Sequence, residues 1–529
     1  MAAFGGGASK RGGAMGRKIL FITTDQQRYD ALGCNGGTVA RTPVADRWAA
    51  DGLRYTRAHA QSVVCMPARS TMVTGQYART HGVWMNGVPL PDDAPSVARY
   101  LHEVAGYRTA LFGKAHFEPF IDNERRFYEN RMAKLGETGP HRGFEHMELA
   151  AHTGRGFLHY PLWLAKNHPG AVAGFYPILK QPSLEQNSAG GGDTGAIQVR
   201  HNPVPRGLYH TDWVADRAIA WLESLPAGAD WFCWVSFPDP HHPWDPPQSE
   251  IHRHRWQDEK LPVNWPATRG NAVALLKDKP KHWLDWYEGR LVTCFEAPPD
   301  FVPSSVTADQ LREINALTHV ENELVDEACG RVWQAIARRG WADDTDVIFT
   351  TDHGELQGDY GLLFKGPYHV DSLMRLPFVW KPAKSANVAP ATIDHPVGQI
   401  DLAPTFCAIA GLETPAWMQS RALPASAAEA AAQRRERVIT EWDSEFKGIT
   451  LHLRTIYRDG LVCTAYEKST LYDGDGSVGE LYDCKEDPLQ RRNLWNDPAW
   501  QRRKKELIAD LYDHLPAARS PKLMPVASV

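Results

Sequence analysis

Two acidic residues in this sequence stand directly after apolar runs that are typical of buried strands. Asp25 ends one such run near the N-terminus, and Asp352 ends another in the second half of the chain. Because open α/β sheets place their sites at the carboxyl ends of parallel strands, we expect both carboxylates at one edge of a sheet. They can bind a hard divalent cation, with the side-chain carbonyl of Gln26 and an imidazole nitrogen of His353 completing the ligands. The sequence therefore predicts a divalent-metal site.

A cysteine with a basic residue four positions later is the second chemical feature. Cys65 begins the run Cys-Met-Pro-Ala-Arg, which follows a short β pattern and opens a helical stretch that includes Arg69. A thiolate at that position could act as a nucleophile. The alternative is a structural cysteine at a helix start, since free cysteines are among the most buried residues. These five residues alone leave both interpretations open.

The elements that would position these residues alternate between strand and helix patterns. Helical spacing is clearest between residues 307 and 339, where Gly340 follows as a stop signal. The alternation predicts an α/β fold with a large, mostly parallel (mixed) sheet sandwiched by helices. Strands are expected at residues 19–22, 108–112, 231–237, 347–351 and 378–380, and further helices at residues 43–51, 95–105, 211–224 and 399–410.

Composition divides the chain into a leader, a large domain and a small one. Residues 1–16 are rich in Gly, Ala and Ser, which predicts a flexible leader. Residues 17–430 form the expected α/β catalytic domain, and residues 431–529 form a smaller C-terminal α+β domain. The β patterns of the smaller domain lie at residues 438–441, 451–457 and 461–466, before a terminal helix at residues 498–514.

A stretch of irregular composition interrupts the large domain between about residues 120 and 306. Within it, residues 231–286 hold seven of the 19 tryptophans, interleaved with prolines. This composition favours ordered loops, rather than helix or sheet, that shape a pocket on a rigid scaffold. Alternatively, most of these tryptophans only pack the loops onto the core.

Several motifs occur in an order that resembles the formylglycine-dependent type I sulfatases (arylsulfatases) of the alkaline phosphatase superfamily. The run from Cys65 to Arg69, followed by Thr74-Gly75, is similar to the signature in which the family's cysteine is oxidised to formylglycine. Six ordered matches span residues 19 to 498, so chance agreement is negligible. The other matching segments are residues 106–109 with Lys114-Ala115-His116, residues 240–243 (Pro-His-His-Pro), residues 352–355 (Asp-His-Gly-Glu) with Lys365, residues 401–405 and residues 480–494.

The resemblance implies a fold like that of alkaline phosphatase and a reaction at sulfate esters. It implies that Cys65 becomes formylglycine (3-oxoalanine), whose hydrate attacks sulfur while the alcohol or phenol leaves. His241 would then be the general acid, with Lys365 able to assist. His116 would take the proton when the enzyme-bound sulfate ester collapses and sulfate is expelled.

The balance of charge at this site agrees with an anionic substrate. Two carboxylates cancel a divalent cation, which leaves Arg69, Lys114 and Lys365 as surplus positive groups. By resemblance, Arg69 would anchor the modified residue and Lys114 would hold the sulfate. In isolation, each of these side chains would be expected in an exposed salt bridge. Together they favour a compact tetrahedral oxyanion and the charge that develops in its transition state.

Two positions differ from the pattern of many sulfatases. Those enzymes have paired Asp residues at the end of the first strand and Asp-Asn at the end of the later one, and all four residues bind Ca²⁺. This chain has Gln26 and His353 at the corresponding positions. The resemblance implies Ca²⁺, whereas an imidazole ligand suits Mn²⁺ better, so we expect one divalent ion that is either Ca²⁺ or Mn²⁺. The same pairs resemble the phosphonate monoester and phosphodiester hydrolases of the superfamily, whereas Lys114 and His116 follow the sulfatase pattern. We therefore expect sulfate monoester hydrolysis, with phosphonate monoester or phosphodiester hydrolysis as the alternative and promiscuity between them left open.

The alcohol half of the substrate leaves fewer traces in the sequence. Asn86 could donate to the substrate oxyanion, or it could be a structural amide of its loop. His242, Trp244 and His252 are candidates for contacts in a pocket formed by the tryptophan-rich stretch. A non-catalytic, sulfatase-like protein that binds anions is a further alternative, although every expected catalytic position is filled.

Composition narrows the setting of this chemistry. The 529 residues carry 58 Lys+Arg against 63 Asp+Glu, a net charge of −5, which gives no drive towards nucleic acid or anionic membranes. The eight cysteines include no C-x-x-C pair, so neither a zinc framework nor a disulfide scaffold is expected. No apolar run approaches the length of about 20 residues that crosses a bilayer, and no secretory signal is visible. We expect a cytoplasmic enzyme that is matured by a formylglycine-generating enzyme, with homo-oligomerisation left open.

Overall fold

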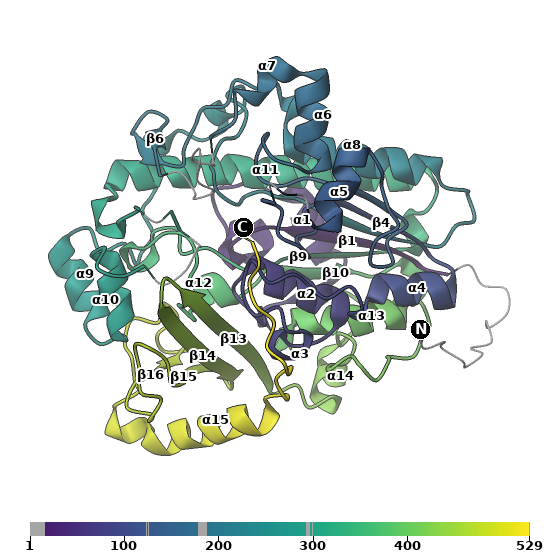
Figure 1. Cartoon of the computed structure of the whole chain (residues 1–529). Coiled ribbons are helices and arrows are strands. Elements are labelled where there is room, and N and C mark those ends of the chain that lie inside the picture. Colours follow the sequence, from purple (N-terminus) through teal and green to yellow (C-terminus); the bar gives the residue numbers. More distant parts are fainter. Residues whose placement is uncertain are drawn as a thin grey trace.

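An eight-stranded mixed sheet forms the centre of the larger domain in the computed structural model (Figure 1). The structure describes residues 16–122, 124, 126–177, 188–292, 297–298 and 300–527. In order across the sheet, the strands are β11 (Ala391–Ile393), β2 (Leu53–Tyr55), β10 (Phe378–Lys381), β9 (Thr345–Thr351), β1 (Lys18–Thr24), β8 (Trp231–Ser236), β4 (Arg108–Gly113) and β5 (His146–Leu149). The five strands from β9 to β5 run parallel, whereas β10 is antiparallel to both of its neighbours.

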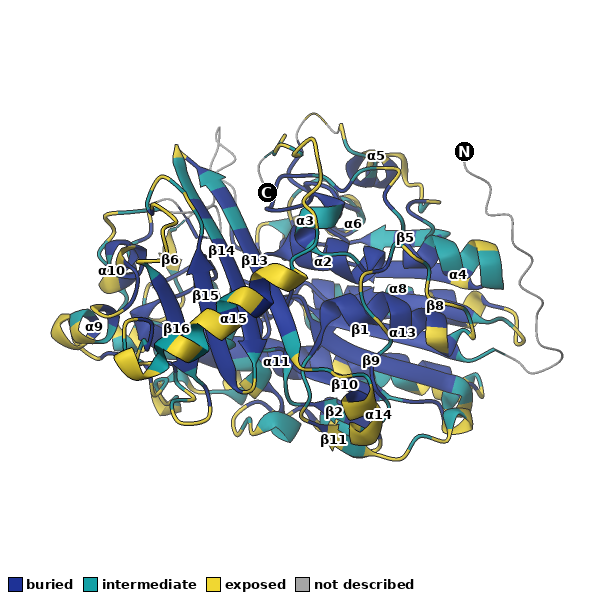
Figure 2. Ribbon diagram, turned by 90° about the horizontal axis from the view of Figure 1, so that it is seen from below, coloured by how far each residue is buried: buried dark blue, intermediate teal, exposed yellow. Residues whose placement is uncertain are grey.

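Side chains of the central strands alternate between two separate cores, as the period of two along a strand requires. In β1, Ile19 and Phe21 belong to one core, while Leu20 and Ile22 belong to the other. Figure 2 shows the central strands buried along their length. Because both faces are covered, these strands form continuous apolar runs in the sequence, which is why they could be predicted.

Helices cover both faces of the sheet. One face packs against α2 (Cys65–Thr74), α4 (Val97–Ala105) and α13 (Leu402–Ile409), and the other packs against α1 (Pro43–Ala50), α8 (His210–Ser224) and α11 (Ala308–Arg338). The long helix α11 begins at a capping box formed by Thr307 and Gln310. The predicted α/β class, with helices on both faces of the sheet, is confirmed.

A four-stranded antiparallel sheet forms the smaller C-terminal domain. Its strands, in spatial order, are β13 (Arg437–Phe446), β14 (Ile449–Arg458), β15 (Leu461–Tyr466) and β16 (Gly479–Asp483). One face of this sheet packs on α15 (Gln501–His514) through Leu507 and Leu511, and Figure 2 shows the outer face of that helix exposed. The other face shares a core with the larger domain. β16 is a strand that the sequence patterns did not predict.

The tryptophan-rich stretch is more helical than its composition predicts. Two helices, α9 (Arg269–Leu276) and α10 (Lys281–Tyr287), lie in the part that we expected to be irregular. Trp283 and Trp286 of α10 pack around Tyr368, with ring centroids 4.6 and 5.2 Å away, and Leu276 of α9 is buried in the same core, which is shared with the C-terminal sheet. Burial of these rings supports the alternative in which most of the tryptophans pack the stretch onto the core.

The rest of the described chain consists of short elements. The leader predicted at residues 1–16 lies outside the described residues, except for Gly16. The seven cysteines that the structure describes are free thiols. No helix within the described ranges is both long and apolar enough to span a bilayer. The short elements are α3 (Ala78–His81), α5 (Tyr128–Leu135), α6 (His159–Asn167), α7 (Pro169–Val172), α12 (Asp371–Met374), α14 (Ala427–Ala432) and the paired strands β3 (Ala58–His59) with β12 (Val397–Gly398) and β6 (Gly190–Gly191) with β7 (Ala196–Ile197).

Candidate active site

Five neighbouring parallel strands deliver polar residues to one edge of the large sheet, at their carboxyl ends. Helix α2 brings Cys65 and Arg69 to the same edge, where both side chains contact residues that follow β1 and β9. In the order β9, β1, β8, β4 and β5, the residues that follow the strands are Asp352 and His353, Asp25 and Gln26, His241 and His242, Lys114 and His116, and His152.

Cys65 is the first residue of α2, so it lies where the free backbone amides of a helix start create a positive potential. Its Sγ lies 3.2 Å from Nε2 of His353 and 3.8 Å from Oδ1 of Asp25. The side chain is buried, and burial raises the pKa of the Cys65 thiol to about 12, with a further contribution from Asp25. The unmodified thiol is therefore protonated near neutral pH and is a weak nucleophile.

The side chains around Cys65 form a group that can hold a metal ion. One ligand atom from each of Asp25, Cys65, Asp352 and His353 lies within 4.8 Å of the others, and all four residues are buried. Nδ1 of His353 donates to the carbonyl of Gly354 at 2.9 Å, which leaves Nε2 free to face the two carboxylates at 3.6 and 3.8 Å. Two carboxylates and an imidazole nitrogen suit a divalent cation.

Gln26 has its side chain engaged by three neighbours. Its Oε1 accepts a hydrogen bond from Nζ of Lys365 at 2.8 Å, and its Nε2 contacts Nδ1 of His242 at 3.1 Å and Oε2 of Glu355. Its backbone amide donates to Oδ1 of Asp352 at 3.0 Å. The amide oxygen thus receives a proton donor in this arrangement, and its predicted role as a metal ligand stays a prediction.

Two buried cations contact the carboxylates of the site. Arg69 donates from Nε to Oδ2 of Asp352 at 2.9 Å and from Nη2 to Oδ2 of Asp25 at 3.3 Å. Nζ of Lys114 also pairs with Oδ2 of Asp25. Burial alone would raise the pKa of Asp25, but Lys114 and Arg69 hold it well below its usual range. Asp25 is therefore ionised, as a metal ligand must be.

His116 is buried without a hydrogen bond to its ring. Neither ring nitrogen has a partner among the described residues. Its φ of 56° lies in the left-handed region that non-glycine residues rarely adopt, and its ring packs edge-on to Phe120 with centroids 5.1 Å apart. Burial lowers the pKa of His116 well below its ordinary value, and Lys114 lowers it further. The result is a neutral imidazole with a free acceptor nitrogen, held in a strained conformation.

His241 and Lys365 form a hydrogen-bonded pair. Nζ of Lys365 lies 3.0 Å from Nε2 of His241, while Nδ1 of His241 faces the carbonyl of His242. Since a carbonyl only accepts, Nδ1 carries a proton and Nε2 accepts from the ammonium group. Burial lowers the pKa of His241, and His242 and Lys365 lower it further.

Three residues predicted as substrate contacts have other roles in the structure. Oδ1 of Asn86 accepts from the backbone amide of Met66 at 3.0 Å, which stabilises the first turn of α2 and agrees with the structural alternative. Trp244 is buried in a core and stacks on Phe364 with centroids 5.8 Å apart. His252 is exposed and bonds a backbone carbonyl at 2.7 Å. Direct substrate contacts by these residues stay predictions.

Two residues of the site were missed by the sequence analysis. His152 follows β5, and its ring lies 4.0 Å from that of His241. No signal pointed to it, because β5 has only four residues. Glu355 is buried, accepts a hydrogen bond from Gln26 and has its pKa raised by burial to about 7. It stands in the Asp-His-Gly-Glu motif, which could have identified it.

In each of the two other groups of potential ligands in the described chain, one carboxylate already has a partner. One contains Glu118, Glu129 and His141, where Arg142 lies 3.4 Å from the carboxylate of Glu118 and supplies a positive charge. The other is built around Glu313, whose carboxylate accepts from two backbone amides at 2.7 and 2.8 Å. Neither group matches the donor set around Cys65.

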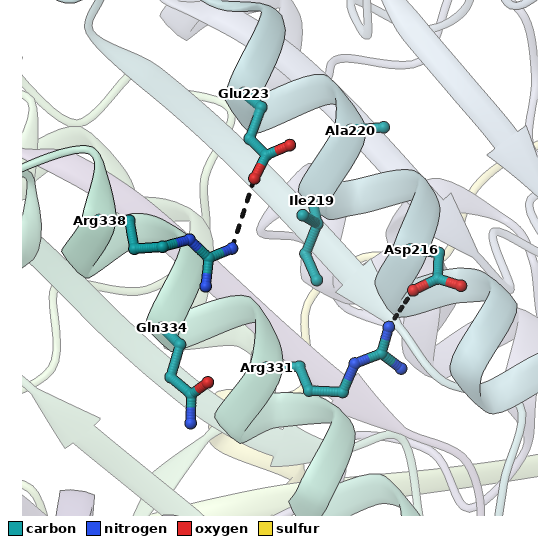
Figure 3. A pocket seen from close by; sticks show the side chains of 7 residues that line it. All are labelled: Asp216, Ile219, Ala220, Glu223, Arg331, Gln334 and Arg338. Carbon is teal, nitrogen blue, oxygen red and sulfur yellow. Dashed lines mark hydrogen bonds and ion pairs between the residues drawn. The ribbon is translucent and has the colours of Figure 1, made fainter. Parts of the chain in front are cut away.

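The cleft in Figure 3 is a surface feature of a different kind. It has a volume of about 400 Å³ and lies between α8 and α11. Its charged side chains point toward one another as ion pairs, Arg338 with Glu223 at 3.4 Å and Arg331 with Asp216. These charges cancel, so the cleft offers no surplus charge to an ionic substrate.

Comparisons with known proteins agree with this geometry. The sulfatase family model matches residues 17–412, and a model described as N-sulphoglucosamine sulphohydrolase, C-terminal, matches residues 358–517. The chain belongs to the sulfatase family. This sulfatase is thus a hydrolase that acts on sulfate esters, and the predicted family is confirmed.

Individual relatives cover almost the whole chain. The uncharacterized sulfatase YidJ of Escherichia coli (strain K12) is 27% identical over 509 residues, covering 95% of this chain and 88% of that protein. The multifunctional alkaline phosphatase superfamily protein PehA of Trinickia caryophylli is 26% identical over 502 residues, covering 92% of each. Phosphonate monoester hydrolase SpPMH from Silicibacter pomeroyi has a similar structure, with a TM-score of 0.74, 23% identity and 96% of both chains covered. The sulfatase and this hydrolase therefore share a fold.

Proposed function

We propose that this sulfatase hydrolyses sulfate monoesters, with Cys65, once converted to formylglycine, as its nucleophile and with one divalent metal ion. The observation that carries the proposal is the position of Cys65 at the N-terminus of α2, within a buried group of two carboxylates and an imidazole. Arg69, Lys114 and Lys365 surround this group and provide more positive charge than the carboxylates alone can balance once a metal is bound. A tetrahedral oxyanion is the ligand that such a centre favours.

The residues around Cys65 fit both groups that the family implies. Asp25, Asp352 and His353 would hold the metal, since each has a ligand atom close to Sγ of Cys65 and to the others. A buried thiol with a pKa of about 12 is a poor nucleophile, which agrees with a need for modification. When present, the metal would activate a hydroxyl of the hydrated formylglycine and draw charge from the bound ester.

The cations would bind and orient the ester. With a divalent ion neutralising Asp25 and Asp352, the positive charges of Arg69 and Lys114 become available to the substrate. The guanidinium of Arg69 is also held at 2.7 Å from Oγ of Ser236, so it is fixed before any substrate enters. Pre-oriented donors of this kind stabilise developing charge without the cost of reorganisation.

Two separate groups would move protons. The His241–Lys365 pair would give a proton to the leaving oxygen, because Nε2 of His241 and Nζ of Lys365 share one hydrogen bond in a buried position. His116, whose ring nitrogens have no partner among the described residues, would accept the proton that is released when sulfate is expelled. A donor and an acceptor at different places let one site serve both halves of the reaction.

A second candidate function is hydrolysis of phosphonate monoesters or phosphodiesters at the same site. Sulfate monoesters, phosphonate monoesters and phosphodiesters each carry one negative charge at neutral pH, so the charge of the site does not separate them. Gln26 and His353 favour this candidate, and PehA, which is named as multifunctional, is similar to the chain over 92% of its length. Lys114 and His116 favour the sulfatase activity.

The deciding experiment compares kcat/KM for an aryl sulfate and an aryl phosphonate on one preparation made with a formylglycine-generating enzyme. We expect the sulfate to be preferred. A phosphonate preference of several decades would overturn the sulfate assignment in favour of the second candidate. The mass of the peptide containing Cys65 is measured on the same preparation by mass spectrometry. An exclusively thiol form without turnover would favour a non-catalytic, anion-binding protein.

The ion is tested by removing metal with a chelator and restoring Mn²⁺ or Ca²⁺ separately. We expect activity to be lost and then to return more fully with Mn²⁺, because His353 offers an imidazole nitrogen. Recovery with Ca²⁺ alone would show that the carboxylates, rather than His353, select the ion. Asp352→Asn should bind less metal at equal protein concentration, which elemental analysis measures independently of activity.

We further propose that the enzyme works in the cytoplasm and is matured there by a formylglycine-generating enzyme. The near-neutral balance of 58 basic and 63 acidic residues and the scattered cysteines support this setting. Expression with and without the maturing enzyme should change the mass of the Cys65 peptide and the activity in parallel.

A further inference from the structure

His152 contacts the proton-donating pair of the proposed reaction, although neither its sequence neighbours nor its short strand draw attention to it. It follows β5, the outermost of the five parallel strands whose carboxyl ends form the site. Its ring stacks on that of His241 with centroids 4.0 Å apart and planes inclined by 21°. His241 in turn bonds Lys365. The stack therefore reaches the group that faces the leaving oxygen in the proposed mechanism.

Ring contacts, rather than a hydrogen bond of its Nδ1, fix the position of His152. The residue is 4% exposed, and its Nδ1 has no hydrogen-bond partner among the described residues. Burying a polar nitrogen without a partner destabilises the folded state. The feature that the fold retains at this position is therefore the aromatic face that lies against His241.

Other rings hold His152 in place. Phe120 packs edge-on to it with centroids 5.6 Å apart, at an interplanar angle of 85°. Phe120 also packs against the ring of His116 and lies 6.0 Å from Nζ of Lys114. His152 is thus wedged between the residues that follow β4 and those that follow β8, and its orientation is set by both.

The stack restrains a motion of His241 that its hydrogen bonds leave free. An imidazole nitrogen donates or accepts in the plane of its ring, so the bonds from Nδ1 to the carbonyl of His242 and from Lys365 to Nε2 oppose movement of His241 within that plane. Tilting out of that plane is opposed instead by the rings of His152 and His242, each 4.0 Å from the His241 centroid. An aromatic face also attracts the positive charge that His241 would gain on taking a proton from Lys365.

We propose that His152 is a positioning residue that keeps His241 aligned between Lys365 and the leaving oxygen. The inference rests on the proposed function. As an oxygen of the modified Cys65 bonds to sulfur, the bond from sulfur to the leaving oxygen breaks. The leaving oxygen takes a proton from the His241–Lys365 pair, and the neutral pair regains a proton from water. Misalignment of His241 would slow this transfer while leaving the nucleophile, the metal ligands and the anion-binding cations in place.

The test compares two sulfate esters that differ in their need for a proton. The nitrophenolate expelled from a nitrophenyl sulfate is stable as an anion, whereas the alkoxide expelled from an alkyl sulfate must be protonated. His152→Ala is expected to lower kcat for the alkyl ester by about 10- to 100-fold, which is less than a full general-acid contribution of about 10²- to 10⁴-fold because His241 and Lys365 remain. The kcat for the nitrophenyl ester should fall by only about two-fold. His152→Phe, which keeps an aromatic face, should restore most of the loss.

His59→Ala is the matched control. His59 is buried, its two ring nitrogens lack partners among the described residues, and its ring contacts Tyr457 at 4.4 Å. Removing the His59 ring should cost a similar amount of packing, but it should change kcat for the two esters by the same factor. If the wild-type enzyme prefers phosphonates, the same two leaving groups are compared on phosphonate monoesters.

Three outcomes would overturn the inference. An equal loss for both esters in His152→Ala would mean that the residue only supports the fold. Rescue by His152→Asn but not by His152→Phe would mean that it bonds the substrate directly rather than acting through His241. If the wild-type enzyme hydrolyses neither kind of ester, the proposed function itself fails, and the inference falls with it.

Discussion

Two buried polar centres of this molecule contain similar residues but satisfy them differently. Beneath the C-terminal sheet, Lys279 donates from Nζ to the hydroxyl of Tyr482 at 2.8 Å and to the carbonyl of Gln490 at 2.9 Å. Glu480 accepts there from the hydroxyls of Tyr466 and Tyr482 at 2.6 and 2.5 Å. One cation and one carboxylate balance, and the polar groups bond each other.

At the carboxyl edge of the large sheet, the balance differs. Arg69, Lys114 and Lys365 lie near the carboxylates of Asp25 and Asp352, while the third carboxyl group, that of Glu355, has its pKa raised by burial to about 7. Several histidines nearby have ring nitrogens without a partner among the described residues. These histidines are His116, His152 and His242. The comparison shows that burial of charge does not by itself mark a functional site. Surplus charge and unsatisfied donors or acceptors do, because they are available to a ligand.

The largest effect that separates the two centres is expected from Cys65→Ala. Loss of the nucleophile should lower kcat by at least about 10⁴-fold, while circular dichroism and the Tm show a folded protein. Cys463→Ala, which removes a buried thiol from β15, is the control and should keep near-normal kcat. Substantial residual activity in Cys65→Ala would contradict the nucleophile assignment.

A smaller loss of rate, without a loss of stability, is expected from His116→Asn. Removing the free acceptor should reduce kcat by about 10²-fold. Stability should be unchanged or higher, because Asn tolerates the left-handed φ of 56° better and a buried imidazole without partners is removed. A thermal melt and steady-state kinetics measure the two quantities. A fall in Tm with unchanged kcat would assign His116 to the fold instead.

In the polar centre beneath the C-terminal sheet, Lys279→Met should have the reverse effect, a loss of stability with little change in kcat. It leaves the buried Glu480 without its cation, so the free energy of unfolding should fall by about 3 kcal/mol. The kcat of the folded fraction should stay within about two-fold of the wild type. Denaturant titration and steady-state kinetics at a temperature well below the Tm make the measurement.

The pH dependence of stability sharpens this prediction. Burial lowers the pKa of Lys279 to about 8, although Glu480 and Asp487 oppose the shift. Between pH 8 and the ordinary lysine pKa of about 10.4, the folded state binds fewer protons than the unfolded state, so stability gains from this group as pH rises. The difference in unfolding free energy between wild type and Lys279→Met should therefore widen across that window. A constant difference would show that Lys279 titrates normally.

The smallest effect is expected at the cleft of Figure 3. Arg338 and Glu223 are both more than half exposed and lie 3.4 Å apart, so Arg338→Ala should change the unfolding free energy by no more than about 1 kcal/mol. It should leave kcat/KM for the preferred ester unchanged. A marked loss of activity would mean that this cleft, with its balanced charges, takes part in function after all.

Particular elements show how much of the fold can be predicted from the sequence. β1, β8 and β9 were predicted close to their observed bounds because burial on both faces makes each a continuous apolar run. The helices α9 and α10 were not, because their buried residues, Leu276 in α9 and Trp283 and Trp286 in α10, belong to a core that forms with the distant C-terminal sheet. The short strands β5 and β16 carry too few residues for a pattern to stand out.

By itself, the sequence determined the family, the α/β class and the candidates that chemistry requires: Cys65 with Arg69, the carboxylates after β1 and β9, and the cations Lys114 and Lys365. Local motifs and strand ends encode these, since each lies within a few residues of its own signal. Only the tertiary structure decided that Asn86 supports the start of α2, that Trp244 belongs to a core and that His152 stacks on His241. Those relations join residues on separate elements, and sheet order and side-chain packing, rather than neighbours in the chain, set the distances between them.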